Sequence, residues 1–117
     1  IEGMVGDTPL TIATVNMPNR GCIPNLPAEM VVEAPASADS QGLHLQPMQP
    51  LPTAIAAMIA LQGQINSLLI EAYVEQSRRK LLQALLLDPT VASYHNAVAL
   101  IDEMCALQRD LLPPLHW

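Results

Sequence analysis

The chain has 117 residues, of which 50% are hydrophobic and 14% charged, and its formal net charge is −6. This composition excludes a disordered chain and allows one domain with a hydrophobic core. Five Lys and Arg residues, three of them adjacent at 78–80, are too few for a nucleic-acid surface, so no nucleic-acid partner is expected.

The first half, residues 1–52, is predicted to form short strands and loops, because it contains eight of the eleven prolines. A β-rich run covers Leu10–Val15, and a second short strand is expected at Met30–Glu33 with an extended exit at Pro35. Residues 43–46 alternate apolar and polar side chains, as a half-buried strand does. The Asp39–Gly42 turn would join two strands in a hairpin.

The loop between the first two strands is rich in Asn, Pro and Gly and extends from Val15 to Pro27. Its prolines fix φ and restrict the residues before them, so the loop should be rigid. Four side chains in it offer hydrogen-bonding groups: Asn16, Asn19, Arg20 and Asn25. Either the amides bond to nearby backbone and shape the turns, or the four side chains line a ligand cleft.

The second half, residues 53–117, is predicted to form three helices. The first begins at Pro52-Thr53 and carries an apolar stripe from Ile55 to Ala72. The second runs from Ser77 to Leu87 and is ended by Asp88-Pro89. Ser93 is the expected N-cap of the third. That helix should stop at Pro113-Pro114 and share one apolar face among Ala97, Leu100, Ile101, Met104 and Leu111.

No residue of the chain is predicted to be catalytic, to bind a cofactor or to ligate a metal. His44 is interpreted as structural, His95 as a surface residue and His116 as part of a tail that is ordered only if it docks. The histidines lack metal-ligand spacing with one another and with the cysteines. Cys22 is expected to be a buried small residue, and Cys22 and Cys105 to be free thiols in a reducing cytoplasm.

The charged side chains of the helical half are interpreted as solvated. Arg78, Arg79 and Lys80 should lie on an exposed helix face, where Arg79 can pair with Glu75. Asp102 and Glu103 should point outward. The longest uninterrupted apolar run, residues 54–61, is too short to cross a bilayer, so no membrane partner is expected.

The segment V-N-M-P-N-R-G-C-I-P-N-L-P-A-E-M-V-V-E-A-P, residues 15–35, resembles the C-terminal region of family 4 glycoside hydrolases. These include 6-phospho-β-glucosidases, 6-phospho-α-glucosidases and α-galactosidases. Residues 70–73, 84–89 and 97–112 are similar to later blocks of the same family, in order and spacing. The predicted fold is therefore a single α+β C-terminal domain covering 1–117, with strands and loops followed by three helices, like the lactate dehydrogenase-type C-terminal domain of the family.

The resemblance implies a longer parent enzyme. The chain begins at Ile1-Glu2 without Met and contains no G-x-G loop. An upstream domain would bind NAD and a divalent metal, commonly Mn²⁺. The resemblance implies a 6-phospho-β-glucosidase-like activity on a sugar or phospho-sugar glycoside. NAD would take hydride from C3, the aglycone would leave by elimination, and water addition and reduction would follow.

In that setting the chain would complete the substrate cleft through Asn16, Asn19, Arg20 and Asn25 and would form contacts in a homo-oligomer. It would bind neither NAD nor metal and would be inactive alone. Two alternatives remain at this point. One is a free-standing helical protein–protein interaction module, and the other is a degenerate enzyme whose upstream half has lost its metal-binding cysteine.

Overall fold

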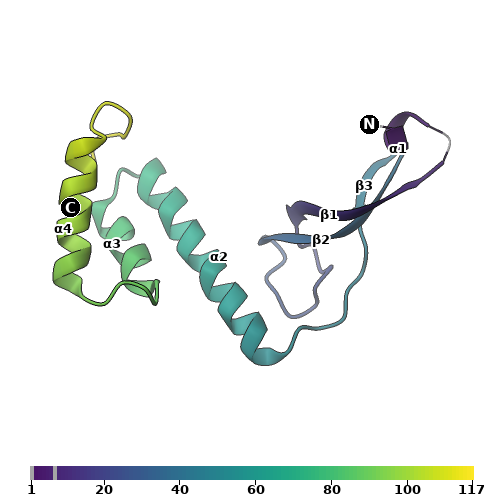
Figure 1. The fold of residues 1–117 in the computed structure, drawn as a ribbon, viewed down its shortest axis with the longest axis horizontal. Coiled ribbons are helices and arrows are strands. Elements are labelled where there is room, and N and C mark those ends of the chain that lie inside the picture. The colour runs from purple at the N-terminus through teal and green to yellow at the C-terminus, as the bar shows by residue number, and fades with distance from the viewer. Residues whose placement is uncertain (1, 7) are drawn as a thin grey trace. The chain divides into compact units, whose positions relative to one another are not determined.

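The structure is a computed structural model and describes residues 2–6 and 8–117. Its elements are α1 (Glu2–Val5), β1 (Leu10–Pro18), β2 (Val31–Asp39), β3 (Gly42–Leu45), α2 (Thr53–Val74), α3 (Arg78–Leu87) and α4 (Tyr94–Leu107) (Figure 1). The α+β class is confirmed, with a three-stranded antiparallel sheet followed by helices. The residues divide into two compact units, 1–60 and 61–117, and the division falls within α2.

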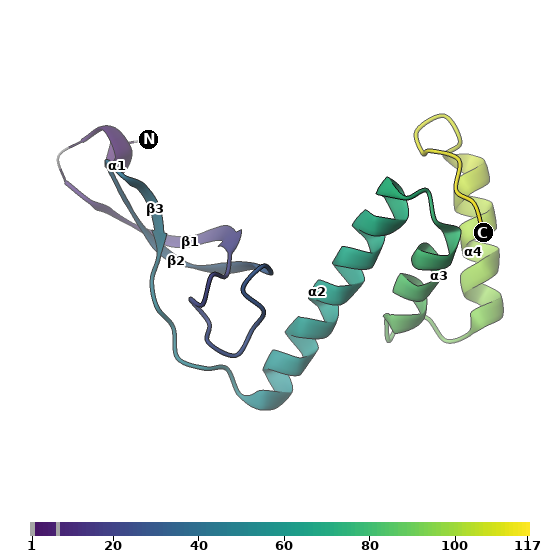
Figure 2. The ribbon, with the colours of Figure 1, turned by 180° about the vertical axis from the view of Figure 1, so that it is seen from behind.

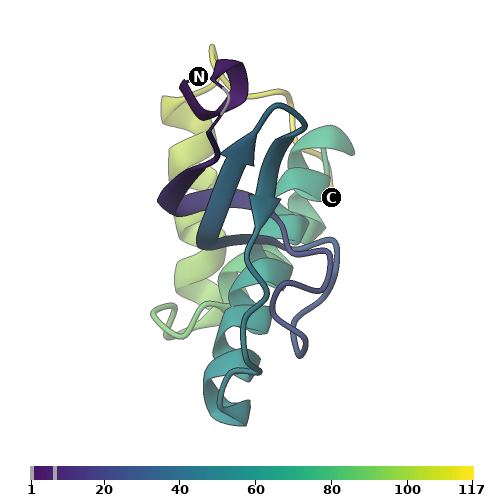
Figure 3. The ribbon, with the colours of Figure 1, turned by 90° about the vertical axis from the view of Figure 1, so that its right-hand side faces the viewer.

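The sheet has the order β1-β2-β3, so β2 is the central strand (Figure 3). Val32 and the alanines at 34, 36 and 38 are buried on one face of β2, and the residues between them are more exposed. The β2–β3 hairpin with its turn at Asp39–Gly42 is confirmed, since these two residues are partners in the register.

Strands β1 and β2 are longer than the sequence predicts. The second strand was expected to end at Glu33, with an extended exit at Pro35, and proline cannot donate to a ladder. In the structure Ile12 faces Ala36 and Val15 faces Ala34, so two β1 residues oppose Pro35 in a bulge. Pairing resumes beyond this irregularity, so β2 continues to Asp39.

Helix α1 was not predicted. It has four residues, and its only buried one is Gly3, which lies against the sheet. A Cβ at Gly3 would lie 2.8 Å from Leu10 Cβ and 2.9 Å from the Ala38 carbonyl oxygen. Only glycine fits this close approach without a shift.

The core of the first unit joins the loop to the sheet. Its buried residues are Cys22, Ile23, Leu26, Val32, Ala34 and Ala56. The burial predicted for Cys22 is confirmed, with 8% of the residue exposed. The loop is therefore fixed by apolar side chains at its centre as well as by its prolines.

Helices α3 and α4 begin within one residue of the predicted positions. The Ser77 hydroxyl accepts from the Lys80 backbone N–H at the start of α3, and Asp88 ends that helix. The Ser93 hydroxyl accepts from the Asn96 N–H at the start of α4. Helices α3 and α4 lie side by side (Figures 1 and 2), around a core of Leu82, Ala97 and Ile101.

The predicted extent of the last helix was wrong. Helix α4 ends at Leu107, and Gln108 is its C-cap. The backbone N–H groups of Leu111 and Leu112 both bond to the Gln108 carbonyl, in a turn that precedes Pro113. Pro113 restricts the conformation of Leu112, which lies at the end of this turn, so the helix ends before the proline acts on it. Leu111 is consequently 81% exposed and lies on no helix face.

The C-terminal tail is docked through its backbone. The Arg78 N–H donates to the His116 carbonyl, and the His116 N–H donates to the Gln76 carbonyl, each at 2.7 Å. These bonds form an isolated bridge between Ser77 and His116. The tail is thereby ordered against the α2–α3 connection.

Helix α2 is long and apolar enough, by length and composition alone, to span a bilayer, with mean hydropathy 1.4 in an 18-residue window. A helix that packs on another part of a protein satisfies the same two criteria. The sequence argument from residues 54–61 therefore fails, because the helix continues through Gln62, Gln64 and Asn66. The absence of a membrane partner stays a prediction.

Candidate functional site

The turn Asn19–Cys22 has two consecutive residues with positive φ. Arg20 has φ +46° and Gly21 has φ +87°, and the Cys22 N–H donates to the Asn19 carbonyl at 2.8 Å. Positive φ at both central residues, closed by this bond, defines a type I′ turn. The sequence did not indicate it, because Arg is not a residue that favours positive φ.

Asn19 shapes the loop from inside. Its residue is 1% exposed, and its Oδ1 accepts from the Ile23 N–H at 2.7 Å. Its Nδ2 lies within 3.0 Å of the Ile23 and Leu26 carbonyls and 3.2 Å from that of Pro27. All the hydrogen-bonding groups of this amide therefore bond to the backbone of the loop. For Asn19 the structure favours the first of the two interpretations, in which the amide shapes the turns.

Asn25 also bonds to backbone. Its Nδ2 donates to the Leu51 carbonyl at 2.8 Å, and its Oδ1 accepts from the Leu51 N–H at 2.9 Å. This pair of bonds ties the loop to the segment that leads into α2. Asn16 instead lies on β1, opposite Glu33, and is exposed. Of the four candidates, Asn16 and Arg20 keep their side chains exposed without a recorded bond within the loop.

A pocket of about 350 Å³ lies between the turn and β3. Its walls include Met17, Arg20, Cys22, Leu43, His44 and Pro47. The turn is held against the segment after β3 by two bonds of Cys22. Its Sγ donates to the Gln46 carbonyl at 3.0 Å, and its carbonyl accepts from the Met48 N–H at 2.8 Å.

His44 is fixed by Asp39, whose Oδ1 lies 2.9 Å from His44 Nε2. The same oxygen accepts from the Gln41 N–H at 2.8 Å. Mainly through the His44 bond, and then the Gln41 bond, these contacts lower the pKa of Asp39 below its ordinary value of 3.8. The structural role predicted for His44 agrees with this pairing, although the ring also borders the pocket.

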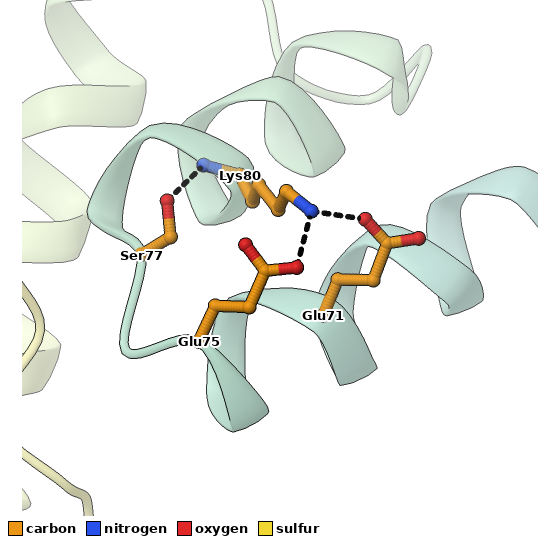
Figure 4. Close-up of polar contacts among 4 residues, drawn as sticks. All are labelled: Glu71, Glu75, Ser77 and Lys80. Carbon is orange, nitrogen blue, oxygen red and sulfur yellow. Dashed lines mark hydrogen bonds and ion pairs between the residues drawn. The ribbon is translucent and has the colours of Figure 1, made fainter.

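A second group of polar contacts lies where α2 meets α3 (Figure 4). Lys80 Nζ lies 2.5 Å from Glu71 Oε2 and 2.7 Å from Glu75 Oε1. These carboxylates raise the pKa of Lys80 above 10.5. The predicted Arg79–Glu75 pair was wrong, because Gln76 at φ +53° reverses the chain and the helical periodicity does not cross the break.

The neighbouring Arg78 is not solvated as predicted. It pairs with Asp102 of α4, and its side chain is only 15% exposed. Its guanidinium carbon lies 4.9 Å from the centre of the Trp117 ring, a cation–π contact. Asp102 remains 62% exposed but is engaged by this pair. His95, predicted to be a surface residue, is exposed.

The helical unit contains an apolar pocket of about 270 Å³. Leu69 and Tyr73 of α2, Leu85 of α3 and Met104 of α4 contribute to its walls. In residues 2–6 and 8–117 no group of three or more His, Cys, Asp or Glu side chains could hold a metal ion. Both cysteines are free, as predicted. The described donors of this chain thus do not fit a manganese site.

The profile of the family 4 glycosyl hydrolase C-terminal domain matches residues 1–91. This chain belongs to glycoside hydrolase family 4. It is the C-terminal domain of that family, as the motifs at residues 15–35 predicted. The match covers the sheet, the Asn-rich loop, α2 and α3.

Relatives of the family 4 domain agree over most of the chain. It is 35% identical over 112 residues to an alpha-glucosidase of Erwinia rhapontici, covering 96% of this chain and 24% of that protein. It is 32% identical over 100 residues to a maltose-6'-phosphate glucosidase of Clostridium acetobutylicum, covering 86% of this chain and 23% of that one. The family 4 domain therefore spans about a quarter of the length of these relatives.

Solved structures show the same domain. A 6-phospho-alpha-glucosidase from gut microorganisms, in complex with NAD and glucose-6-phosphate, superposes with a TM-score of 0.89 at 29% identity, over 98% of this chain and 26% of that one. The 6-phospho-beta glucosidase of Thermotoga maritima, with manganese, NAD⁺ and glucose-6-phosphate, gives 0.88 at 27% identity, over 97% and 28%. NAD and manganese are thus present in structures of relatives of this family 4 domain.

Proposed function

We propose that this family 4 domain is part of an NAD- and divalent-metal-dependent glycosidase that hydrolyses phosphorylated glucosides in the cytoplasm. The observation that carries the proposal is the superposition of nearly the whole chain on 6-phospho-glucosidases that hold NAD and glucose-6-phosphate. The β-anomer is the proposed substrate, following the 6-phospho-β-glucosidase-like activity that the family resemblance implies. The α-anomer is the substrate to compare with it, because the relative from gut microorganisms is named a 6-phospho-alpha-glucosidase.

The proposal divides the labour between two parts of one polypeptide. An upstream domain would hold NAD and the metal, because the described residues of this chain offer no metal-binding cluster. The C-terminal domain would supply the rigid Asn-rich loop at the border of the substrate cleft. Its exposed polar side chains there are Asn16 and Arg20.

The exposed apolar residues of helix α2 indicate that another domain covers this helix. Its exposed apolar residues include Ile55, Met58, Leu61, Ile70 and Val74. At 100° per residue they span more than half of the circumference, and a helix that is apolar nearly all round is normally covered. We assign the cover to the upstream domain of the same chain, with a second copy of the enzyme in a homo-oligomer as a further contact.

The test compares two polypeptides in the presence of NAD, Mn²⁺ and an aryl 6-phospho-β-glucoside. The 117-residue chain should give no turnover, and the gene extended upstream should give an active enzyme. Turnover by the 117-residue chain, or none by the extended polypeptide on either anomer, would contradict the proposal. The corresponding glucoside without phosphate is the control for the phosphorylated substrate and should be hydrolysed more slowly.

The second candidate is a free-standing interaction module, which the exposed apolar side chains of α2 and α4 favour. Size-exclusion chromatography with light scattering separates the two. The family 4 proposal predicts that the 117-residue chain self-associates alone and becomes soluble and defined in size when joined to its upstream domain. A monomer at high concentration, together with a start codon close to Ile1, would favour the module.

A further inference from the structure

Arg20 occupies a backbone position that its residue type disfavours. In a type I′ turn the two central residues have positive φ, and Gly, Asn and Asp dominate there because other side chains crowd the backbone. Arg20 has φ +46° at the first of these positions. Arg at such a site costs stability, so a role for its side chain is the hypothesis that the observed strain motivates.

None of the ion pairs among the described residues involves the Arg20 side chain. It is the only Lys or Arg in residues 1–77, and it is exposed. The ion pairs among the described residues involve His44, Arg78, Lys80 and Arg109 but not Arg20. The strained turn therefore presents a guanidinium that no recorded carboxylate of the described chain neutralises.

The surroundings of Arg20 suit an anion. None of the residues that line the pocket beside it is acidic, and His44 forms part of the wall. The Asp39 bond holds the His44 ring in place through Nε2. The neighbouring Gly21 leaves open space, since a Cβ there would meet no atom within 4 Å. A ligand can thus approach the turn without displacing a side chain.

We propose that Arg20 is a specificity-determining residue that binds the phosphate of a phosphorylated sugar in the pocket between the Asn19–Cys22 turn and β3. A guanidinium presents two parallel N–H donors, which match two oxygens of a phosphate. The identity of the sugar rests on the proposed function, whereas the anion site depends only on the turn and the pocket. Asn19 positions Arg20 by fixing the loop on both sides of it.

Three variants of the 117-residue chain, kept below the concentration at which light scattering detects self-association, test this site: Arg20→Gly, Arg20→Lys and the control Arg109→Ala. Arg109 is an exposed residue of the other unit, with 81% of its side chain accessible. Glucose-6-phosphate, inorganic phosphate and glucose are titrated separately, and the backbone amide shifts of Gly21 and His44 are followed by NMR. Thermal melting of each variant is recorded in the same buffer.

The proposal predicts opposite effects of Arg20→Gly on stability and on binding. The variant should melt at a higher temperature, because glycine tolerates positive φ. It should bind glucose-6-phosphate at least about tenfold more weakly, as expected for loss of a charge-assisted pair. Arg20→Lys, which keeps the charge without the two parallel donors, should lie between, and Arg109→Ala should match the unmodified chain in both measurements.

Two results would overturn the assignment. One is glucose-6-phosphate binding by Arg20→Gly with unchanged affinity. The other is equal affinity of the unmodified chain for glucose-6-phosphate and inorganic phosphate, which would show an anion site without sugar recognition. Failure of the proposed function is a separate result, because it appears as absence of glycoside hydrolysis by the extended polypeptide while the Arg20-dependent shifts persist.

Discussion

The side chain of Asn19 bonds to both backbone groups of Ile23, accepting from its N–H at 2.7 Å and donating to its carbonyl at 3.0 Å. A carboxamide is the side-chain group that carries an acceptor and donors on one short stem. The same Nδ2 reaches the carbonyls of Leu26 and Pro27. One buried amide therefore replaces the secondary structure that the loop lacks, and it fixes the turn that presents Arg20.

Replacing Asn19 by alanine should lower the free energy of unfolding by about 2–4 kcal/mol, because it leaves a buried N–H and buried carbonyls without partners. Asn19→Asp should cost at least as much, since a carboxylate would face the carbonyls of Ile23 and Leu26. Urea denaturation followed by circular dichroism measures both. The contrast between the two variants also tests whether the donor half of the amide matters.

Asn25→Ala is the matched control for this loop. Its two bonds to the Leu51 backbone are exposed to water, which can replace them. The expected loss is about 1 kcal/mol or less. Equal costs at positions 19 and 25 would show that burial of the Asn19 amide contributes nothing.

The sequence predicted the parts of the fold that local chemistry controls. Ser93 was expected to cap a helix, Asp88-Pro89 was expected to end one, and both expectations are confirmed. Two errors arose where a distant partner decides the structure. The bulge opposite Pro35 depends on β1, and the burial of Arg78 depends on Asp102 in another helix. Neither partner is visible in a local pattern.

The candidate site was only partly predictable for a related reason. An Asn-rich loop gives the same sequence pattern whether its amides bind backbone or a ligand, so the roles of Asn19 and Asn25 needed coordinates. The positive φ of Arg20 could not be predicted from the sequence, because Arg is not a typical residue for that position. Cys22, which anchors the turn to residue 46, was expected to be buried, but its bond was not foreseen.

The pKa of Asp39 should depend on His44. In the folded chain it lies below the ordinary 3.8, so the carboxylate stabilises the hairpin above about pH 3.8, and this contribution disappears as the pH falls through the folded value. His44→Ala removes the largest cause and should move the Asp39 pKa back toward 3.8, with the Gln41 N–H keeping part of the shift. Carbon-detected NMR titration of the Asp39 carboxyl measures it.

Asp88 provides an internal reference in the same titration. Its pKa is lowered by bonds from the hydroxyl and the N–H of Thr90, far along the sequence from His44. His44→Ala should leave it unchanged. A parallel movement of both carboxyls would indicate a global change in the chain and would refute the specific pairing of Asp39 with His44.

Lys80 should lose its raised pKa when its carboxylates are neutralised. Glu71 is the larger cause and Glu75 the second, so Glu71→Gln should lower the Lys80 pKa toward 10.5, and the double substitution with Glu75→Gln should lower it further. The pKa of Lys80 is higher in the folded chain than in the unfolded chain. The ion pairs of Lys80 with Glu71 and Glu75 therefore stabilise the fold below about pH 10.5, and this contribution is lost as the pH rises through the folded pKa. NMR of the Lys80 side chain follows the titration.

Arg79 distinguishes this arrangement from the pairing that sequence spacing suggests. If Glu75 paired with Arg79, Arg79→Ala would change the environment of Glu75 and lower the melting temperature. The structure instead joins Glu75 to Lys80. Arg79→Ala should therefore melt like the unmodified chain, and Lys80→Ala should melt at a lower temperature.

The end of α4 can be tested by two leucine-sized side chains of opposite burial. Ile101 is 2% exposed in the core between α3 and α4, so Ile101→Ala should cost about 2–5 kcal/mol of unfolding free energy. Leu111 is 81% exposed beyond the end of the helix, so Leu111→Ala should change stability by no more than about 0.5 kcal/mol. The sequence pattern places both on one helix face. A cost at Leu111 close to that at Ile101 would mean that α4 continues past Gln108 and buries Leu111, against the turn that the structure places there.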